Sequence, residues 1–398
     1  MNPAHHGTEP VFDFRRIVLR AYGPSLLLGI SNGAILPIIA LSARELGSSV
    51  ALAALIVSLI GMGAVAGSLP AALIISRYGE RRALVASSWA CAGALLICFF
   101  VSHILALVAG IFLYGLASSV FNLARQAHII EIVPIHMKAR GLASLGGAER
   151  IGIFLGPFAA AAIMESMGLS AAYWVAAIAM AAAGTLCWTL RQAPNRPAIP
   201  AAVPRAGLAA IARSHARMFL TLGAGVLLIS SIRASRPLVI PLWADHIGIS
   251  PPTMSLVFGI ASAIDMLAFY PAGKIMDRYG RRWIAIPSAL ILGASMLLLP
   301  YVSDLTGFVL ACVAMGLGNG IGAGMVMTIG ADASPVEGRT EFLGIWKLLD
   351  DIGLSLGPVI LSSCTVLFSL GAGIALMGLG GMAAGTVFWR YLPSRKPA

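Results

Sequence analysis

The chain has 398 residues, of which 59% are hydrophobic and only 11% are charged, and its mean hydropathy is +0.90. A soluble domain carries about 25% charged residues, so the composition excludes an ordinary soluble protein. The formal net charge of +11 would suit a nucleic-acid-binding protein only if the basic residues clustered on a soluble domain. They do not, and no nucleic-acid partner is predicted.

Twelve apolar stretches are long enough to cross a membrane, because about 20 apolar residues span its hydrocarbon core. In lipid, a segment of this length satisfies its own backbone as a helix. The sequence therefore predicts an all-α integral membrane protein that crosses the cell membrane many times. The predicted helices 1 to 12 cover roughly residues 18–43, 48–75, 83–102, 104–126, 142–165, 169–190, 217–243, 251–276, 283–302, 306–330, 341–366 and 368–390.

Lys and Arg residues are distributed unequally between the two sides that this topology creates. Of the 27, 22 lie in segments on the side of the N-terminus, Arg44 lies in a loop on the other side, and the remaining four lie within helices. Loops rich in Lys and Arg face the cytoplasm, so both termini are predicted to be cytoplasmic. Anionic headgroups of the membrane lipid are the expected partner of these basic residues.

A short basic string occurs twice in the chain. Residues 77–82 read RYGERR and residues 278–282 read RYGRR, and the glycines of the two copies, Gly79 and Gly280, are 201 residues apart. A repeat at about half the chain length predicts two pseudo-symmetric six-helix bundles. The expected divisions are an N-terminal bundle at 1–190, a cytoplasmic linker at 191–216 and a C-terminal bundle at 217–398.

A second repeated element, G-x-x-x-G-P, has the same spacing. It places two glycines on one face of a helix, which allows another helix to approach closely, and its proline permits a bend. The predicted helix-packing residues are therefore Gly152, Gly156 and Pro157 in helix 5 and Gly353, Gly357 and Pro358 in helix 11.

At these motifs the chain resembles the major facilitator superfamily over essentially its full length. The loop between helices 2 and 3 in that family reads approximately G-x-x-x-D-R-x-G-R-R, and residues 273–282 match it fully. The first copy has Ala72, Ser76 and Glu80 where glycine, aspartate and a basic residue are usual. The resemblance implies a transporter that works by alternating access, as a monomer and without a cofactor.

The G-x-x-x-G-P element is similar to a motif in helix 5 of the drug exporters of this superfamily. That motif continues into a Gly-Gly pair, which Ala160 and Ala161 replace here. The arginine that many proton-coupled exporters carry in the middle of helix 4 has no counterpart, since residues 104–122 are uncharged.

The repeated hairpins are predicted to form the gating motif: Ser76, Arg77, Gly79, Asp277, Arg278, Gly280 and Arg281. Gly280 is expected to provide the turn that ends helix 8, while the arginines anchor at headgroups. A carboxylate makes a stronger latch than a hydroxyl, so we expect Asp277 to hold the inner gate more firmly than Ser76. The alternative is that both loops only set the topology.

Eight charged residues lie in the interiors of the predicted helices, away from the helix ends: Glu149, Arg150, Arg233, Arg236, Asp265, Lys347, Asp350 and Asp351. Each costs about 2.5–3.5 kcal/mol to insert, so such residues are functional candidates. An ion pair between Arg233 and Asp265 is predicted, either as a permanent tie between helices 7 and 8 or as a switch. Arg236 is expected to reach towards the membrane surface.

Proton coupling is predicted at carboxylates that lack a full cationic partner. Lys347 is spaced to pair with either Asp350 or Asp351, which leaves one of them without a cation. The candidates are Asp265, Asp350, Asp351 and Glu149.

The resemblance implies that helices 1, 4, 7 and 10 form the substrate cavity. The polar and aromatic candidates there are Asn32, Tyr114, Asn122, Arg233 and Asn319, with Met315 beside them and Trp346 in helix 11 as a cavity or core residue. The many glycines around Asn319 favour a helix that bends.

The leading prediction is a secondary active transporter of small lipophilic or drug-like solutes, working by proton-coupled efflux. The alternatives are proton-coupled uptake of an organic anion and a receptor or scaffold that does not transport. An enzyme is not expected, because the helices hold no metal-ligand cluster and no serine with a nearby histidine base.

Overall fold

The computed structural model describes residues 14–100, 103–132, 138–189, 208–335 and 338–393. Every regular element within these ranges is a helix. Most of the linker expected at 191–216 lies outside the described residues, and its last part forms the short helix α8 (Leu208–Ser214).

The first half of the chain contains α1 (Phe14–Ile35), α2 (Ile39–Glu45), α3 (Val50–Tyr78), α4 (Glu80–Phe99), α5 (Ile104–Ile132), α6 (Lys138–Met167) and α7 (Ala171–Trp188). The second half contains α9 (Ala216–Met218), the π-helical turn η2 (Phe219–Gly223), α10 (Ala224–His246), α11 (Pro251–Tyr279), α12 (Arg282–Leu298), η3 (Leu299–Tyr301), α13 (Leu305–Ile321), α14 (Met325–Ala333), α15 (Arg339–Leu367) and α16 (Leu370–Tyr391). Twelve helical spans among the described residues are long and apolar enough to cross a membrane, which confirms the predicted number.

Three of these spans are interrupted where the sequence predicts continuous helices. Helix 1 is divided into α1 and α2 around Pro37, which lacks a backbone N–H. Helix 7 begins with the π-helical turn η2. Helix 10 is divided into α13 and α14 beside Gly324, whose φ of +78° favours glycine. Helix 10 is thus interrupted between Ile321 and Met325, where the sequence predicts only a bend.

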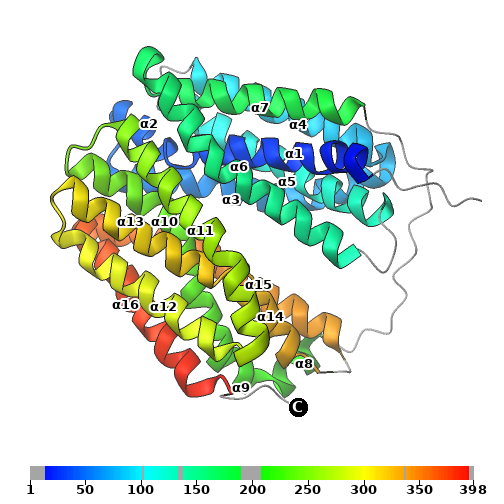
Figure 1. Cartoon of the computed structure of the whole chain (residues 1–398), viewed down its shortest axis with the longest axis vertical. Coiled ribbons are helices and arrows are strands. Elements are labelled where there is room, and N and C mark those ends of the chain that lie inside the picture. The colour runs from blue at the N-terminus through cyan, green and yellow to red at the C-terminus, as the bar shows by residue number, and fades with distance from the viewer. Residues whose placement is uncertain (1–13, 101–102, 133–137, 190–207, 336–337, 394–398) are drawn as a thin grey trace, which may run out of the picture.

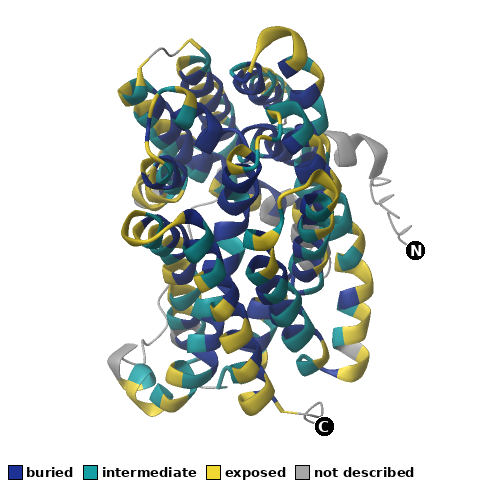
Figure 2. Ribbon diagram, turned by 90° about the vertical axis from the view of Figure 1, so that its left-hand side faces the viewer, coloured by how far each residue is buried: buried dark blue, intermediate teal, exposed yellow. Residues whose placement is uncertain are grey.

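The spans form two bundles that pack their helices in the same pairs (Figure 1). In the first bundle α1 contacts α6 and α7, while α5 contacts α3 and α4. In the second bundle α10 contacts α15 and α16, while α13 contacts α11 and α12. Buried residues lie where helices face one another, and exposed residues lie on the outer surfaces (Figure 2).

The predicted packing glycines lie at close helix contacts inside each bundle. A Cβ atom at Gly152 or Gly156 would overlap the backbone of α1. A Cβ atom at Gly353 or Gly357 would overlap the backbone of α10. These glycines let α6 and α15 approach α1 and α10 closely enough to fix the direction of their side chains.

The two bundles meet along α6 with α11 and along α3 with α15. We call the end that carries Gly79 and Gly280 the hairpin face and the other end the opposite face. Near the opposite face the Ser255 hydroxyl donates to the Pro157 carbonyl, and the Ser362 hydroxyl donates to the Ala51 carbonyl, each at 2.9 Å. The ribbons of the bundles diverge towards the hairpin face (Figure 1).

Candidate functional site

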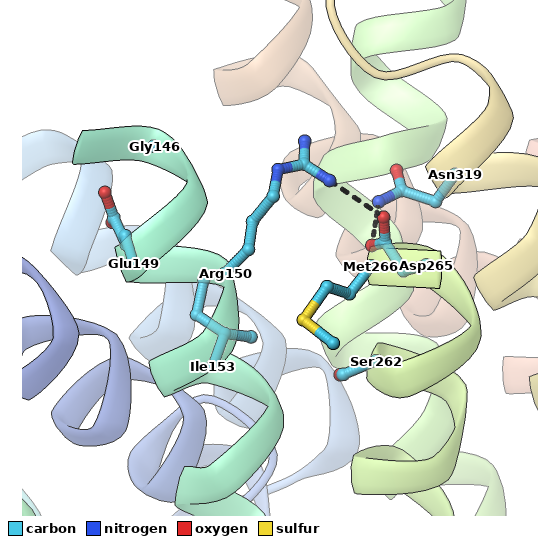
Figure 3. A pocket seen from close by; sticks show the side chains of 8 residues that line it. All are labelled: Gly146, Glu149, Arg150, Ile153, Ser262, Asp265, Met266 and Asn319. Carbon is cyan, nitrogen blue, oxygen red and sulfur yellow. Dashed lines mark hydrogen bonds and ion pairs between the residues drawn. The ribbon is translucent and has the colours of Figure 1, made fainter. Parts of the chain in front are cut away.

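Asp265 of α11 is the centre of a polar cluster that joins the two bundles. Its Oδ1 accepts a hydrogen bond from Arg150 Nη1 of α6 at 3.1 Å (Figure 3). Its Oδ2 accepts from Arg236 Nη1 of α10 at 3.0 Å and from Asn319 Nδ2 of α13 at 2.5 Å. We call Arg150, Arg236, Asp265 and Asn319 the Asp265 cluster. It connects one side chain of the first bundle to three of the second.

Close contact between α11 and α13 brings Asp265 and Asn319 together. A Cβ atom at Gly316 would overlap the backbone of Ala261, and one at Gly320 would overlap the backbone of Asp265 itself. The glycine-rich part of α13 therefore lies directly against α11. Asn319, between these two glycines, is held within reach of the carboxylate.

Arg233 binds the broken helix rather than Asp265, so the predicted Arg233–Asp265 ion pair is wrong. Its Nε donates to Asn319 Oδ1 at 2.9 Å, Nη2 donates to the Asn319 carbonyl at 2.8 Å, and Nη1 donates to the Gly322 carbonyl at 3.0 Å. These are carbonyls at the C-terminal end of α13, which a cation stabilises.

Arg236 is the residue of helix 7 that binds Asp265, so its expected position near the membrane surface is also wrong. Its side chain is buried, and its guanidinium lies 5.7 Å from the centre of the Phe258 ring. The sequence places Arg233 and Arg236 three residues apart on one face. Only the way α10 packs against α11 and α13 decides which of them binds the carboxylate.

A cavity of about 330 Å³ lies against the Asp265 cluster (Figure 3). Its walls come from α6 of the first bundle and from α11 and α13 of the second. The lining residues are Gly146, Glu149, Arg150, Ile153, Ser262, Asp265, Met266 and Asn319. Five of these eight lining residues thus have charged or polar side chains. A pocket of this size, at the small end of the range for ligand sites, suits a small polar solute.

Glu149 has an arginine partner that the sequence reading did not include. Arg125 Nη2 lies 2.5 Å from Glu149 Oε2, and the Arg125 side chain is buried. Its Nε and Nη1 atoms are buried without a hydrogen-bond partner. Arg125 falls inside the candidate membrane span Ile104–Ile129 of α5, although the count of basic residues includes it among the segments on the side of the N-terminus. The sequence does place Arg125 near the end of predicted helix 4, three residues after the substrate candidate Asn122.

The substrate candidates of the first bundle do not line the cavity. Tyr114 is fully buried, and its hydroxyl donates to Asn32 Oδ1 at 2.7 Å and lies 3.2 Å from the Ser31 hydroxyl. This contact ties α5 to α1. Asn122 is partly buried on α5. Of the six predicted substrate residues, only Asn319 lines this cavity.

Trp346 is a packing residue in this structure. Its side chain is 3% exposed, its indole N–H donates to the Val326 carbonyl at 2.8 Å, and its ring lies against Gly330. Met315 is also fully buried. Trp346 therefore fastens α15 to α14, the second part of the broken helix.

The charged residues of α15 form a separate group. Lys347 Nζ lies 3.0 Å from Asp350 Oδ2 and 2.6 Å from Asp351 Oδ1, so one lysine serves both carboxylates. Asp350 also accepts a hydrogen bond from the Ser230 hydroxyl of α10 at 2.6 Å. Neither aspartate lines the cavity. The expectation that one of them lacks a cationic contact is wrong.

The two hairpins share their turn geometry but differ in their ion pairs. Gly79 and Gly280 have φ values of +81° and +100°, which favour glycine. Beyond Gly280, Arg281 Nε lies 2.6 Å from Asp332 Oδ2 of α14. In the first copy, Glu80 lies 3.5 Å from His128 of α5.

The predicted gate cannot be compared at its two central positions, because the side chains of Ser76 and Asp277 lie outside the described residues. Arg77 and Arg278 each lie over the ring of the tyrosine that follows them. The described residues contain no group of three or more His, Cys, Asp and Glu side chains that could hold a metal ion.

The family is shown by comparison with known proteins. The model of the Major Facilitator Superfamily matches residues 25–238 and 221–398. The chain belongs to this superfamily. The twelve candidate membrane spans of the described residues agree with that assignment.

Two curated proteins resemble parts of the chain. An uncharacterized transporter of Methanocaldococcus jannaschii is 23% identical over 122 residues, or 31% of this chain and 32% of that protein. The arabinose-proton symporter of Bacillus subtilis is 27% identical over 150 residues, or 36% of this chain and 32% of that protein. The matched region thus spans about a third of each relative.

Solved structures of other transporters share the fold over nearly the whole chain. A bacterial homolog of the human lysosomal transporter Spinster has a TM-score of 0.79 at 12% identity, covering 98% of this chain and all of that one (100%). A D-xylose-proton symporter has a TM-score of 0.70 at 16% identity, covering 95% and 98%. Identities this low establish the fold alone.

Proposed function

We propose that this transporter takes up a small organic anion together with a proton, through the cavity beside the Asp265 cluster. The observation that carries the proposal is an excess of arginine around Asp265, and one of these arginines, Arg150, lines the cavity. Arg150, Arg233 and Arg236 surround the single carboxylate of Asp265, directly or through Asn319. The second carboxylate of the cavity, Glu149, already has Arg125 as its partner.

The charges of the membrane interior leave room for one anionic group. Around the cavity the cations are Arg125, Arg150, Arg233 and Arg236 and the anions are Glu149 and Asp265; adding the α15 group of Lys347, Asp350 and Asp351 leaves one excess positive charge in this set. A buried charge without compensation is strongly destabilising, and a guanidinium does not lose its proton. A monovalent anion in the cavity would supply the missing charge.

Arg150 is the residue best placed to bind that anion. It lines the cavity, and 30% of its side chain is exposed. Its hydrogen bond to Asp265 uses Nη1, so Nε and Nη2 remain for a carboxylate or phosphate group. Its guanidinium lies 4.6 Å from the centre of the Phe269 ring, which fixes its plane.

Sharing of Arg150 would couple the anion to a proton. In this structure Asp265 pairs with two arginines, so it can take up a proton only when one of them leaves. The substrate anion competes with the Asp265 carboxylate for Arg150, and loss of that pair lets Asp265 accept the proton. By linkage, the bound anion then favours protonation of Asp265 to the same extent. Uptake driven by an inward proton gradient follows from this reciprocity. The names of the arabinose-proton and xylose-proton symporters support proton coupling in similar proteins.

Efflux of a lipophilic solute has less support at this site. Ile153 and Met266 are the large apolar side chains of the cavity lining. Apart from Gly146, the other lining residues have charged or polar side chains. Removing water from these side chains without a polar substrate to replace it would be costly.

The orientation belongs to the same proposal. The basic hairpins and both termini are assigned to the cytoplasmic side of the cell membrane by the positive-inside rule. The two bundles touch near the opposite face, so on this assignment the described conformation is closed to the outside.

The proposal is tested by measuring the melting temperature of the purified protein at pH 6 and pH 8. The added compounds are small carboxylates, phosphates, sugars and lipophilic cations. We expect stabilisation by a monoanion, stronger at pH 6, that Arg150→Ala abolishes and Arg150→Lys weakens. Asp265→Asn should bind the anion with little dependence on pH. Arg213→Ala, on exposed α8, is the control.

Transport into proteoliposomes under an inward proton gradient then tests the direction. Accumulation of the stabilising anion is expected, and it should collapse when a protonophore is added. Stabilisation by lipophilic cations alone, with Arg150→Ala behaving as the parent protein, would overturn the proposal.

A further inference from the structure

A second cavity lies at the hairpin face, away from the Asp265 cluster. It has a volume of about 340 Å³ and is lined by Arg81, Arg82, Val85, Ala86 and Trp188. The membrane span of α4 begins at Glu80, and that of α7 ends at Trp188. The cavity therefore lies between the ends of two neighbouring spans, at the depth where lipid headgroups meet the hydrocarbon core.

The polar part of this cavity is cationic. Arg81 Nη2 donates to the Trp188 carbonyl, which holds the guanidinium across the space between α4 and α7. Arg82 is exposed beside it. No acidic residue is among the described lining residues. The neighbouring Glu80 lies near His128 of α5 instead.

The remaining lining is apolar and continues along the bundle. Val85 and Ala86 form the wall one turn further into the membrane. Trp188 is 65% exposed, and an indole at this depth prefers the interface between headgroup and chain. Beyond it, Trp89 lies against Gly184 and is 48% exposed, so a large apolar surface faces outwards along α4 and α7.

A ligand that suits this cavity has a negative headgroup attached to an apolar chain. Guanidinium groups bind phosphate oxygens through paired, charge-assisted hydrogen bonds. A free inorganic phosphate would use the arginines but not the apolar wall. A phospholipid would use both.

We propose that this cavity binds the headgroup of an anionic phospholipid from the surrounding membrane. The phosphate lies between Arg81 and Arg82, and one acyl chain follows Val85, Ala86 and Trp89. The bound lipid would fasten α4 to α7 at the hairpin face. This proposal does not depend on the transported substrate or on the direction of transport.

Native mass spectrometry of the purified protein with phosphatidylglycerol tests the proposal, with phosphatidylcholine of the same chains as the neutral comparison. We expect tighter retention of phosphatidylglycerol. R81A/R82A should lower its affinity by roughly 30-fold, because basic residues near the membrane surface act nearly additively on anionic lipids. R282A/R390A removes two charges from the same face of the second bundle and should keep the affinity.

Two further measurements separate the alternatives. Ala86→Trp fills the cavity without changing its charge and should also release the lipid, with folding checked by thermal melting. Inorganic phosphate should neither compete with phosphatidylglycerol nor stabilise the protein. Unchanged binding in both R81A/R82A and Ala86→Trp would overturn the proposal, and so would equal loss in R282A/R390A. Full competition by inorganic phosphate would assign the site to a free anion instead.

Discussion

Two arginines three residues apart in α10 have different roles in this structure. Arg236 binds the Asp265 carboxylate, whereas Arg233 donates all of its recorded hydrogen bonds to Asn319 and Gly322 at the end of α13. Asn319 connects the two, since its amide donates to Asp265 and its oxygen accepts from Arg233. Asn319 therefore links the Asp265 carboxylate to Arg233, which binds the end of α13.

Arg233→Lys should destabilise the protein while leaving anion binding in place. A lysine ammonium cannot reproduce the planar set of three donors, and each hydrogen bond to a charged group contributes about 1.5–3 kcal/mol. We expect a lower melting temperature of the purified protein, with Arg213→Lys on exposed α8 melting like the parent. A variant that melts normally but no longer binds the anion would make Arg233 a substrate ligand.

Close packing at glycines organises the elements of each bundle. A Cβ atom at Gly357 of α15 would meet the Ser231 carbonyl and the Ser235 hydroxyl of α10, whereas one at Gly344 of the same helix would meet nothing within 4 Å. The first glycine is thus required by the neighbouring helix and the second is not. The sequence motif identified the required position, because its spacing places two small residues on one helix face.

Gly357→Ala and Gly344→Ala should consequently have opposite effects. Overpacking at Gly357 should lower the free energy of unfolding by about 1–3 kcal/mol. At Gly344 the alanine should be neutral or stabilising, because alanine favours a helix over glycine by about 1 kcal/mol. Thermal melting of the two variants, side by side, measures the difference. Equal melting temperatures would show that α15 can shift away from α10 without cost.

At the scale of the whole molecule, few polar contacts join the two bundles among the residues that the structure describes. At the opposite face, Arg44 at the end of α2 lies 3.4 Å from Asp245 at the end of α10, and the two positions are 201 residues apart. The side chains are 37% and 42% exposed, and pairs so exposed contribute about 0–1 kcal/mol. Such a contact can bias the closed state of this face without locking it.

Charge reversal at this pair should shift the balance between conformations. Arg44→Asp or Asp245→Arg alone places like charges together and should lower the ratio of closed to open molecules by up to about fivefold. The double reversal should restore it. Distances between spin labels at Leu52 and Val366, exposed on α3 and α15 at this face, measure the change. If the double variant stays as open as the single ones, the pair does not bias this equilibrium.

The sequence by itself determined the twelve spans, the repeated hairpins and most of the buried charges. Each of these is a property of a short window: about 20 apolar residues predict a span, and any ionisable residue inside one is marked by its cost. Arg125 was missed because it lies near the end of its window, where a span and a basic segment look alike.

Only the tertiary structure decided which charges belong together. Arg150 and Asp265 are separated by 115 residues and come from different bundles, and Arg236 rather than Arg233 faces the carboxylate. The choice depends on which helices pack together and how each is rotated about its axis, and the packing glycines fix both. Local sequence patterns identify the candidate residues of the site. Contacts between helices that are distant in the sequence decide which of these residues come together.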